Sequence, residues 1–233
     1  MRSFAALVSM ILAFAAFPLA AQEIGHAFVE VEIRNFDSGS ERFVSAQPSR
    51  PQLAPVPEGV AAYGPFRVLD GNRAAIVGVT DARTPAAFAQ MMRDWPQIAL
   101  LEMVDVPGTE DDRANLRLGR MIRAARIATY VPAGGSVRSG GVELFVAGIQ
   151  RYADADAEFA VHAWMDEDGL EATDYAASAH ENAKYLAYYR QMGMAAGEAA
   201  AFYAMTNSVP HDDARWLSGA QMAHWVKLNG TES

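Results

Sequence analysis

The sequence predicts an α/β protein whose sheet is mostly parallel. Two observations lead to this class: apolar runs of strand length alternate with segments in which apolar residues recur at helical spacing, and the last third of the chain keeps helical spacing. The expected strands are 66–69, 74–79, 98–104, 127–131 and 159–162, and the expected helices are 84–95, 109–125, 139–149, 181–192, 195–205 and 218–226. A repeated strand–helix unit lays successive strands side by side and parallel.

Turn and cap residues mark the borders of the first elements. Asp70-Gly71-Asn72 separates the first two strands and predicts a hairpin. Thr84 stands before Pro85 where the first helix begins, so we expect Thr84 to be its cap. Thr109 is expected to cap the next helix, because three acidic residues follow it and a first helical turn favours negative charge.

The first 21 residues have the features of a cleavable secretory signal. Arg2 supplies positive charge, an apolar run follows from Phe4 to Phe17, and Ala21 is the small residue that a signal peptidase needs. The run is shorter than the roughly 20 apolar residues of a stable membrane anchor, which disfavours the alternative of an uncleaved anchor. We therefore expect cleavage after Ala21 and a periplasmic or secreted mature protein without a membrane anchor.

Residues 22–62 differ from the remainder of the chain. Alternating apolar and polar residues at 28–33 predict one strand, and a stretch rich in serine and proline follows it. We interpret 22–62 as an N-terminal arm or linker and expect the folded domain over 63–233.

Composition excludes several classes of function. The 233 residues carry a formal net charge of −9 without a basic tract, so we expect neither nucleic acid nor an anionic membrane as partner. The chain has no cysteine, which removes disulfides, thiol nucleophiles and cysteine-ligated metals. The spacing of His162, His180 and His211 matches no zinc motif, so we expect no metal and no cofactor.

The candidate site for chemistry begins at Ser139. A glycine-containing turn leads into an expected helix there, and the amides of Gly140 and Gly141 at a helix start can stabilise negative charge on a carbonyl oxygen. His162 at the end of the next strand is a candidate base, and Asp212 or Asp213 further along the chain is a candidate partner for the imidazole. The alternative is that Ser139 is simply a helix cap.

Four segments carry a resemblance to a known family. They are Val104-Asp105-Val106-Pro107-Gly108-Thr109, the ten residues from Ser139 to Gly148, Phe159-Ala160-Val161-His162, and the eight residues from His211 to Ser218. With these segments, the stretch from Ala74 to Val226 resembles the ClpP/crotonase superfamily, and more closely a group of predicted periplasmic proteins related to Clp-type serine peptidases. The resemblance implies repeated ββα units with C-terminal helices, a peptide or small acyl substrate, and assembly into a homo-oligomer.

The resemblance also implies roles for individual residues. By position, Ser139 corresponds to the nucleophile, His162 to the general base, and Asp213 (or Asp212) to the carboxylate that orients the base. A variant takes Lys184 as the base, since related signal-peptide peptidases use a Ser–Lys pair. The simpler interpretation of Lys184 is a surface lysine.

The implied oxyanion hole consists of backbone amides of Gly108, Thr109 and Gly140. Here the sequence departs from the family, because Thr109 stands where the family has a second glycine and Arg138 introduces a bulky charge beside Ser139. The two functional hypotheses are therefore an exported, peptidase-like serine hydrolase and a catalytically inactive relative that serves as a periplasmic binding or assembly protein.

Overall fold

The computed structural model describes residues 54–229 and, for their backbone, residues 42–43. The expected signal peptide (1–21), the expected strand at 28–33 and most of the expected arm lie outside the described residues.

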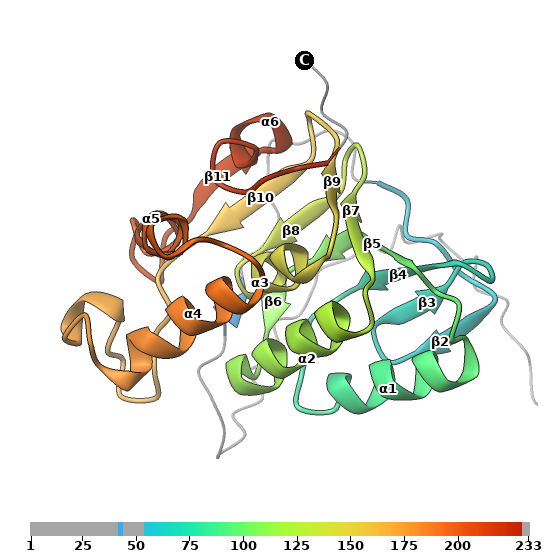
Figure 1. Cartoon of the computed structure of the whole chain (residues 1–233), viewed down its shortest axis with the longest axis horizontal. Helices are drawn as coiled ribbons and strands as arrows, with labels where there is room; N and C mark the ends of the chain where they lie inside the picture. Colours follow the sequence, from blue (N-terminus) through green and yellow to red (C-terminus); the bar gives the residue numbers. More distant parts are fainter. Residues whose placement is uncertain (1–41, 44–53, 230–233) are drawn as a thin grey trace, which may run out of the picture. The chain divides into compact units, whose positions relative to one another are not determined.

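The described chain is built on a nine-stranded sheet (Figure 1). Its strands are β2 (Ala61–Tyr63), β3 (Phe66–Val68), β4 (Arg73–Val77), β5 (Leu100–Val106), β7 (Ala128–Val131), β8 (Ser136–Arg138), β9 (Arg151–Ala153), β10 (Glu158–Val161) and β11 (Arg215–Ser218). The pairs that β4, β5, β7, β8, β9 and β10 form with one another are all parallel, whereas β2, β3 and β11 add antiparallel edges. The predicted α/β class with a mostly parallel sheet is confirmed.

Two different strands pair with the same side of β5, and the sheet therefore splits into two branches there. Its first half pairs with β7, where Leu100 lies opposite Ala128, and its end pairs with β8, where Asp105 lies opposite Ser136. One branch continues from β7 to β9 and the other from β8 to β10 and β11. In the second branch, the chain continues from the end of β8 directly into Ser139. No pattern in the sequence predicts β2, β8, β9 or β11, each of which has only three or four residues.

The hairpin between β3 and β4 is confirmed. The carboxylate of Asp70 accepts the amide hydrogens of Asn72 and Arg73 and closes the turn. Strand β2 lies on both sides of the expected boundary at 62/63, so the sheet begins within the expected arm.

Six α-helices and one 3₁₀ turn accompany the described strands. They are α1 (Thr84–Asp94), α2 (Asp112–Ala124), α3 (Gly140–Ala147), η1 (Ala172–Asp174), α4 (His180–Gln191), α5 (Ala196–Thr206) and α6 (Gly219–Met222). The expectation that Thr84 caps α1 is wrong: Arg83 holds the cap position, and the Thr84 hydroxyl accepts the amide hydrogen of Asp81 from inside the helix.

The expectation that Thr109 caps α2 is also wrong. Thr109 lies in the short strand β6 (Gly108–Thr109), and its hydroxyl bonds to the backbone of Thr80 and Asp111. The cap is Asp111, whose carboxylate accepts the amide hydrogen of Ala114 at 2.9 Å. The chain stays extended through Thr109 because strand contacts use its backbone and hydroxyl, and the helix cap lies two residues later than expected.

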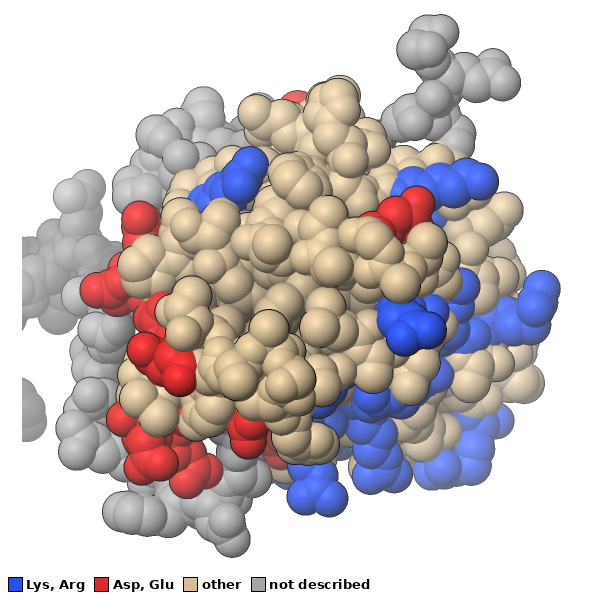
Figure 2. All heavy atoms as spheres, turned by 60° about the vertical axis from the view of Figure 1, so that its left-hand side comes forward, with Lys and Arg blue, Asp and Glu red and all other residues tan. Residues whose placement is uncertain are grey.

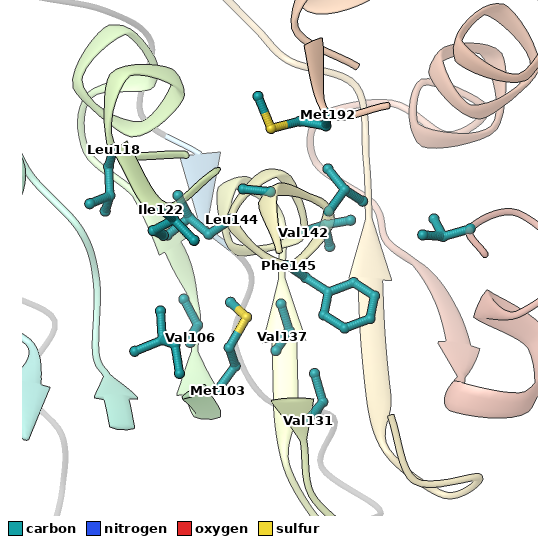
Figure 3. Close-up of a cluster of buried hydrophobic side chains, with 14 of the residues drawn as sticks. Met103, Val106, Leu118, Ile122, Val131, Val137, Val142, Leu144, Phe145 and Met192 are labelled. Atoms are coloured by element: carbon teal, nitrogen blue, oxygen red, sulfur yellow. The ribbon is translucent and has the colours of Figure 1, made fainter. Parts of the chain in front are cut away.

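Helix α3 lies at the centre of the core, and all of its eight residues are buried. Figure 3 shows Val142, Leu144 and Phe145 of α3 surrounded by apolar side chains from the sheet and from neighbouring helices. Apart from Glu143, whose carboxylate accepts the hydroxyl hydrogen of Tyr189 at 2.7 Å, the helix consists of glycine and apolar residues, which is typical of a helix with no face toward water.

Charge is unevenly distributed over the surface. Figure 2 shows Lys and Arg side chains toward one edge of the face in view and Asp and Glu side chains toward the opposite edge. Arg113, Arg117 and Arg120 of α2 are exposed.

None of the helices in the described part of the chain combines the length and the apolarity needed to cross a membrane.

Candidate active site

Ser139 occupies the sharp turn between β8 and α3. Its φ is 49° and its ψ is −125°, a left-handed conformation that costs a residue other than glycine about 1–3 kcal/mol. The turn is held by the Ser139 amide, which donates to the carbonyl of Ala160 in β10 at 2.8 Å. Its hydroxyl makes no cap hydrogen bond to α3, so the interpretation of Ser139 as a plain helix cap finds no support in the geometry.

The structure brings Ser139 and His162 together. His162 follows the last residue of β10, and its Nε2 lies 2.7 Å from the Oγ of Ser139. The Nδ1 atom of the same ring lies 2.9 Å from the carbonyl oxygen of Ala163. Because a carbonyl oxygen can only accept, Nδ1 carries the proton of the neutral ring and Nε2 accepts from the serine hydroxyl. This is the tautomer that a general base requires.

A second histidine contacts the same carbonyl. The ring of His211 packs edge-on against His162, with 4.7 Å between ring centroids, and its Nδ1 lies 3.2 Å from the oxygen of Ala163. The amide of His211 donates to the carboxylate of Glu171 at 2.8 Å, which fixes this loop beside the site. In the sequence, His211 stands out only as the first residue of the fourth family-like segment and as one of three histidines without zinc spacing, and neither pattern predicts its contact with His162.

Asp212 and Asp213 are both exposed. Asp213 is engaged within its own loop, where its carboxylate accepts the amide hydrogen of Ala214 at 2.7 Å and its amide donates to the carbonyl of Pro210 at 3.2 Å. The loop therefore brings His211 to the imidazole of His162 and leaves both carboxylates at the surface. An orienting role for Asp213 or Asp212 stays a prediction.

The backbone amides expected to form the oxyanion hole come from two elements that nearly touch. A Cβ atom built on Gly140 would lie 2.6 Å from the Cγ2 of Thr109, so α3 begins directly against β6. Asn115 of α2 holds the junction, since its amide nitrogen donates to the carbonyl of Gly140 at 2.6 Å and its oxygen accepts from the hydroxyl of Thr80 at 3.0 Å. Gly108 has a φ of 141°, which only glycine adopts readily.

Arg138 is buried and paired, although it directly precedes Ser139. Its guanidinium lies 2.9 Å from the carboxylate of Asp105 as a close ion pair, and it donates to the Oγ of Ser136 at 2.7 Å. The Ser136 hydroxyl in turn donates to Glu158 at 2.7 Å. A buried charge is tolerated only when it is paired and hydrogen-bonded. The carboxylate of Asp105 therefore compensates the positive charge of Arg138, and the hydroxyl of Ser136 accepts a hydrogen bond from it.

Lys184, the alternative base, interacts with aromatic rings. Its ammonium lies 5.0 Å from the ring centre of Tyr185 and 5.4 Å from that of Trp164, which is the geometry of a cation–π contact.

Within residues 54–229, no group of three His, Asp or Glu side chains is arranged to hold a metal ion.

No protein-family model matches the chain, and neither does any curated protein. Among solved structures, a ClpP1 mutant from Listeria monocytogenes is similar over 69% of this chain and 94% of that chain, with 14% identity and a TM-score of 0.47. A mutant of the 1510-N membrane-bound stomatin-specific protease is similar over 66% and 76% of the two chains, with 12% identity and a TM-score of 0.46. Another mutant of that protease, in complex with a substrate peptide, gives 66% and 74%, with 16% identity and a TM-score of 0.43. At these values the likeness carries no conclusion about the activity of this chain.

Proposed function

We propose that this protein is an exported serine hydrolase of peptidase type, with Ser139 as nucleophile and His162 as general base. The observation that carries the proposal is the 2.7 Å contact between Ser139 Oγ and His162 Nε2, with the opposite ring nitrogen anchored on a carbonyl oxygen. A nucleophile next to a base that a third group orients is the arrangement that activates a hydroxyl. The four sequence segments that resemble the ClpP/crotonase superfamily support the same assignment, the placement in its periplasmic group and assembly into a homo-oligomer.

The proposed reaction is acyl transfer to water. Ser139 Oγ attacks the carbonyl carbon of a peptide or small acyl substrate while His162 Nε2 takes the hydroxyl proton. The carbonyl oxygen becomes an oxyanion, which the amides of Gly140 and of Gly108 or Thr109 would stabilise. His162 then gives its proton to the leaving group as the bond between that group and the carbonyl carbon breaks, which leaves the acyl group on Ser139. Water attacks this ester while the same imidazole takes its proton, and the proton passes to Ser139 Oγ as the bond between Oγ and the acyl carbon breaks. The carbonyl of Ala163 stabilises the imidazolium that forms, because its negative end faces Nδ1.

A fluorophosphonate probe tests this proposal in the purified mature protein. Wild type should be labelled, whereas Ser139→Ala and His162→Ala should each lose labelling. Ser218→Ala is the matched control, because Ser218 is a genuine helix cap that accepts the amide hydrogen of Gln221 and is expected to leave labelling intact. Lys184→Met should also leave labelling unchanged, and a loss of labelling in that variant would favour the Ser–Lys mechanism.

The second candidate function is a catalytically inactive binding or assembly protein. Two observations favour it: Thr109 replaces a glycine of the family's turn, and only 1% of Ser139 and 0% of His162 is exposed. If wild type is not labelled by any acylating or phosphonylating probe, the inactive function replaces the hydrolase.

A further inference from the structure

A short N-terminal segment pairs with the backbone beside the candidate nucleophile. Strand β1 (Arg42–Phe43) runs antiparallel to β6, with Arg42 opposite Thr109 and Phe43 opposite Gly108. The two strands form a small sheet separate from the nine-stranded one. In Figure 1 the blue β1 segment lies next to β6.

The hydrogen bonds of β6 show which of its atoms face β1. The carbonyl of Gly108 accepts from the Thr80 amide at 3.0 Å, and the Glu110 amide donates to the Thr80 carbonyl at 2.8 Å. In a trans peptide the C=O of one residue and the N–H of the next point to opposite sides. The N–H and C=O of Thr109 therefore point away from Thr80, toward Arg42. Arg42 and Thr109 form the hydrogen-bonded pair of this ladder, and the next pair along an antiparallel ladder is not hydrogen-bonded.

The Thr109 amide is also one of the candidate oxyanion-hole donors. Its side chain touches the start of α3, and Ser139 is the residue immediately before that helix. An extended peptide that adds a strand to an exposed edge uses the N–H and C=O groups of alternate residues. On β6 such a peptide needs the same two groups of Thr109 that Arg42 pairs with.

We infer that Arg42–Phe43 is an intramolecular occupant of a peptide-binding edge on β6, and that an extended peptide must displace it to bind beside Ser139. The segment lies 21 residues downstream of Ala21, so it is retained after the expected cleavage. A segment tethered to the same chain competes at an effective concentration of about a millimolar, which restrains weakly binding peptides. The consequence for activity rests on the proposed function, whereas the pairing and the competition do not.

Proline substitutions in the full mature chain test the pairing. Arg42→Pro removes the N–H that faces Thr109, whereas Phe43→Pro removes an N–H outside the hydrogen-bonded pair and is the matched control. Arg42→Ala and Phe43→Ala separate loss of the side chain from loss of the amide. The readouts are the hydrogen-exchange protection of the Thr109 amide and the affinity for a synthetic peptide with the sequence of residues 38–47.

In Arg42→Pro, relative to Arg42→Ala, protection of the Thr109 amide is expected to fall roughly five- to tenfold and peptide affinity to rise by a similar factor, which corresponds to one backbone hydrogen bond. Phe43→Pro should match Phe43→Ala in both readouts. Unchanged protection in Arg42→Pro, or equal peptide affinity in Arg42→Pro and Arg42→Ala, would overturn the inference. Fluorophosphonate labelling of the same variants is a separate readout: faster labelling of Arg42→Pro links the edge to catalysis, and absence of labelling in every variant counts against the hydrolase alone.

Discussion

The close approach of α3 to β6 leads to a quantitative prediction at Gly140. An alanine methyl there would lie 2.6 Å from the Cγ2 of Thr109, a separation that real Cβ atoms do not adopt. Thr109 is fully buried, and its hydroxyl accepts the amide hydrogen of Asp111 and has the carbonyls of Thr80 and Asp111 as acceptors for its single hydrogen, so its methyl has little room to move. Overpacking of this kind costs about 1–3 kcal/mol, and we expect Gly140→Ala to lower the free energy of unfolding by about 2 kcal/mol.

Thr109→Ser removes the opposing methyl and keeps the hydroxyl. Alone, it should cost about 1 kcal/mol for the lost buried methyl. In the double variant the new methyl on residue 140 fills the space that the threonine methyl leaves. Two close contacts of that methyl remain, with the Cβ of residue 109 at 3.1 Å and with the Asn115 amide nitrogen at 3.2 Å. Both are shorter than usual, but small shifts can accommodate them. We therefore expect the double variant within about 1 kcal/mol of wild type, which gives a favourable coupling of about 2 kcal/mol.

Urea unfolding of the four proteins measures this coupling. Gly141 provides the matched control, because a Cβ atom there would lie 2.8 Å from Val106 Cγ1 and 3.0 Å from the Val106 carbonyl, and neither contact involves Thr109. Gly141→Ala combined with Thr109→Ser should be additive within about 0.5 kcal/mol. If the Gly140 pair is equally additive, β6 and the start of α3 are not in contact, and the two sides of the candidate oxyanion hole do not meet as described.

Three further predictions concern the fold and the export of the chain. Burial and the hydrogen bond to Asp154 raise the pKa of Tyr130 from 10.0 to about 12. The protonated phenol therefore contributes to the free energy of unfolding in full below pH 10, and this contribution is lost as the pH rises through about 12. The difference in unfolding free energy between wild type and Tyr130→Phe should be constant below pH 10 and shrink between pH 10 and about 12, and a difference independent of pH would contradict this cause. Gly119→Ala should destabilise by about 3 kcal/mol or more in urea unfolding, because its methyl would lie 1.9 Å from the hydroxyl of the fully buried Tyr188, and an unchanged midpoint would refute that packing. N-terminal sequencing of periplasmic material should find Gln22 first, and an intact leader in the membrane fraction would refute export.

Ser139 and His162 could be named as a candidate pair from the sequence because each residue borders a locally recognisable element. Ser139 follows a glycine turn and precedes an apolar helix, and His162 closes a short apolar strand. In a parallel sheet, the carboxyl ends of adjacent strands meet at one edge. That topology brings the two residues together, even though β8 itself escaped prediction.

Features that depend on long-range contacts escaped the sequence analysis. The role of Thr109 is set by Thr80, which is 29 positions away, and a threonine before acidic residues looks like a cap unless that contact is known. His211 reaches the site only through the fold, since it shares the carbonyl of Ala163, which is 48 positions away. Neither contact leaves a periodicity or a motif in the sequence.

The burial of α3 on every side has a consequence for how the candidate site responds to changes elsewhere. A helix with one solvent-exposed face can rotate about its axis and exchange one surface contact for another. Helix α3 has no such face, because its eight residues are all buried, and any rotation that improves one contact worsens another. The orientation of Ser139 at its first turn is therefore fixed by the interior as a whole. Changes of side-chain volume in the core, at Phe145 within α3 or at Met192 at the end of α4, should therefore shift the position of Ser139 before they unfold the chain.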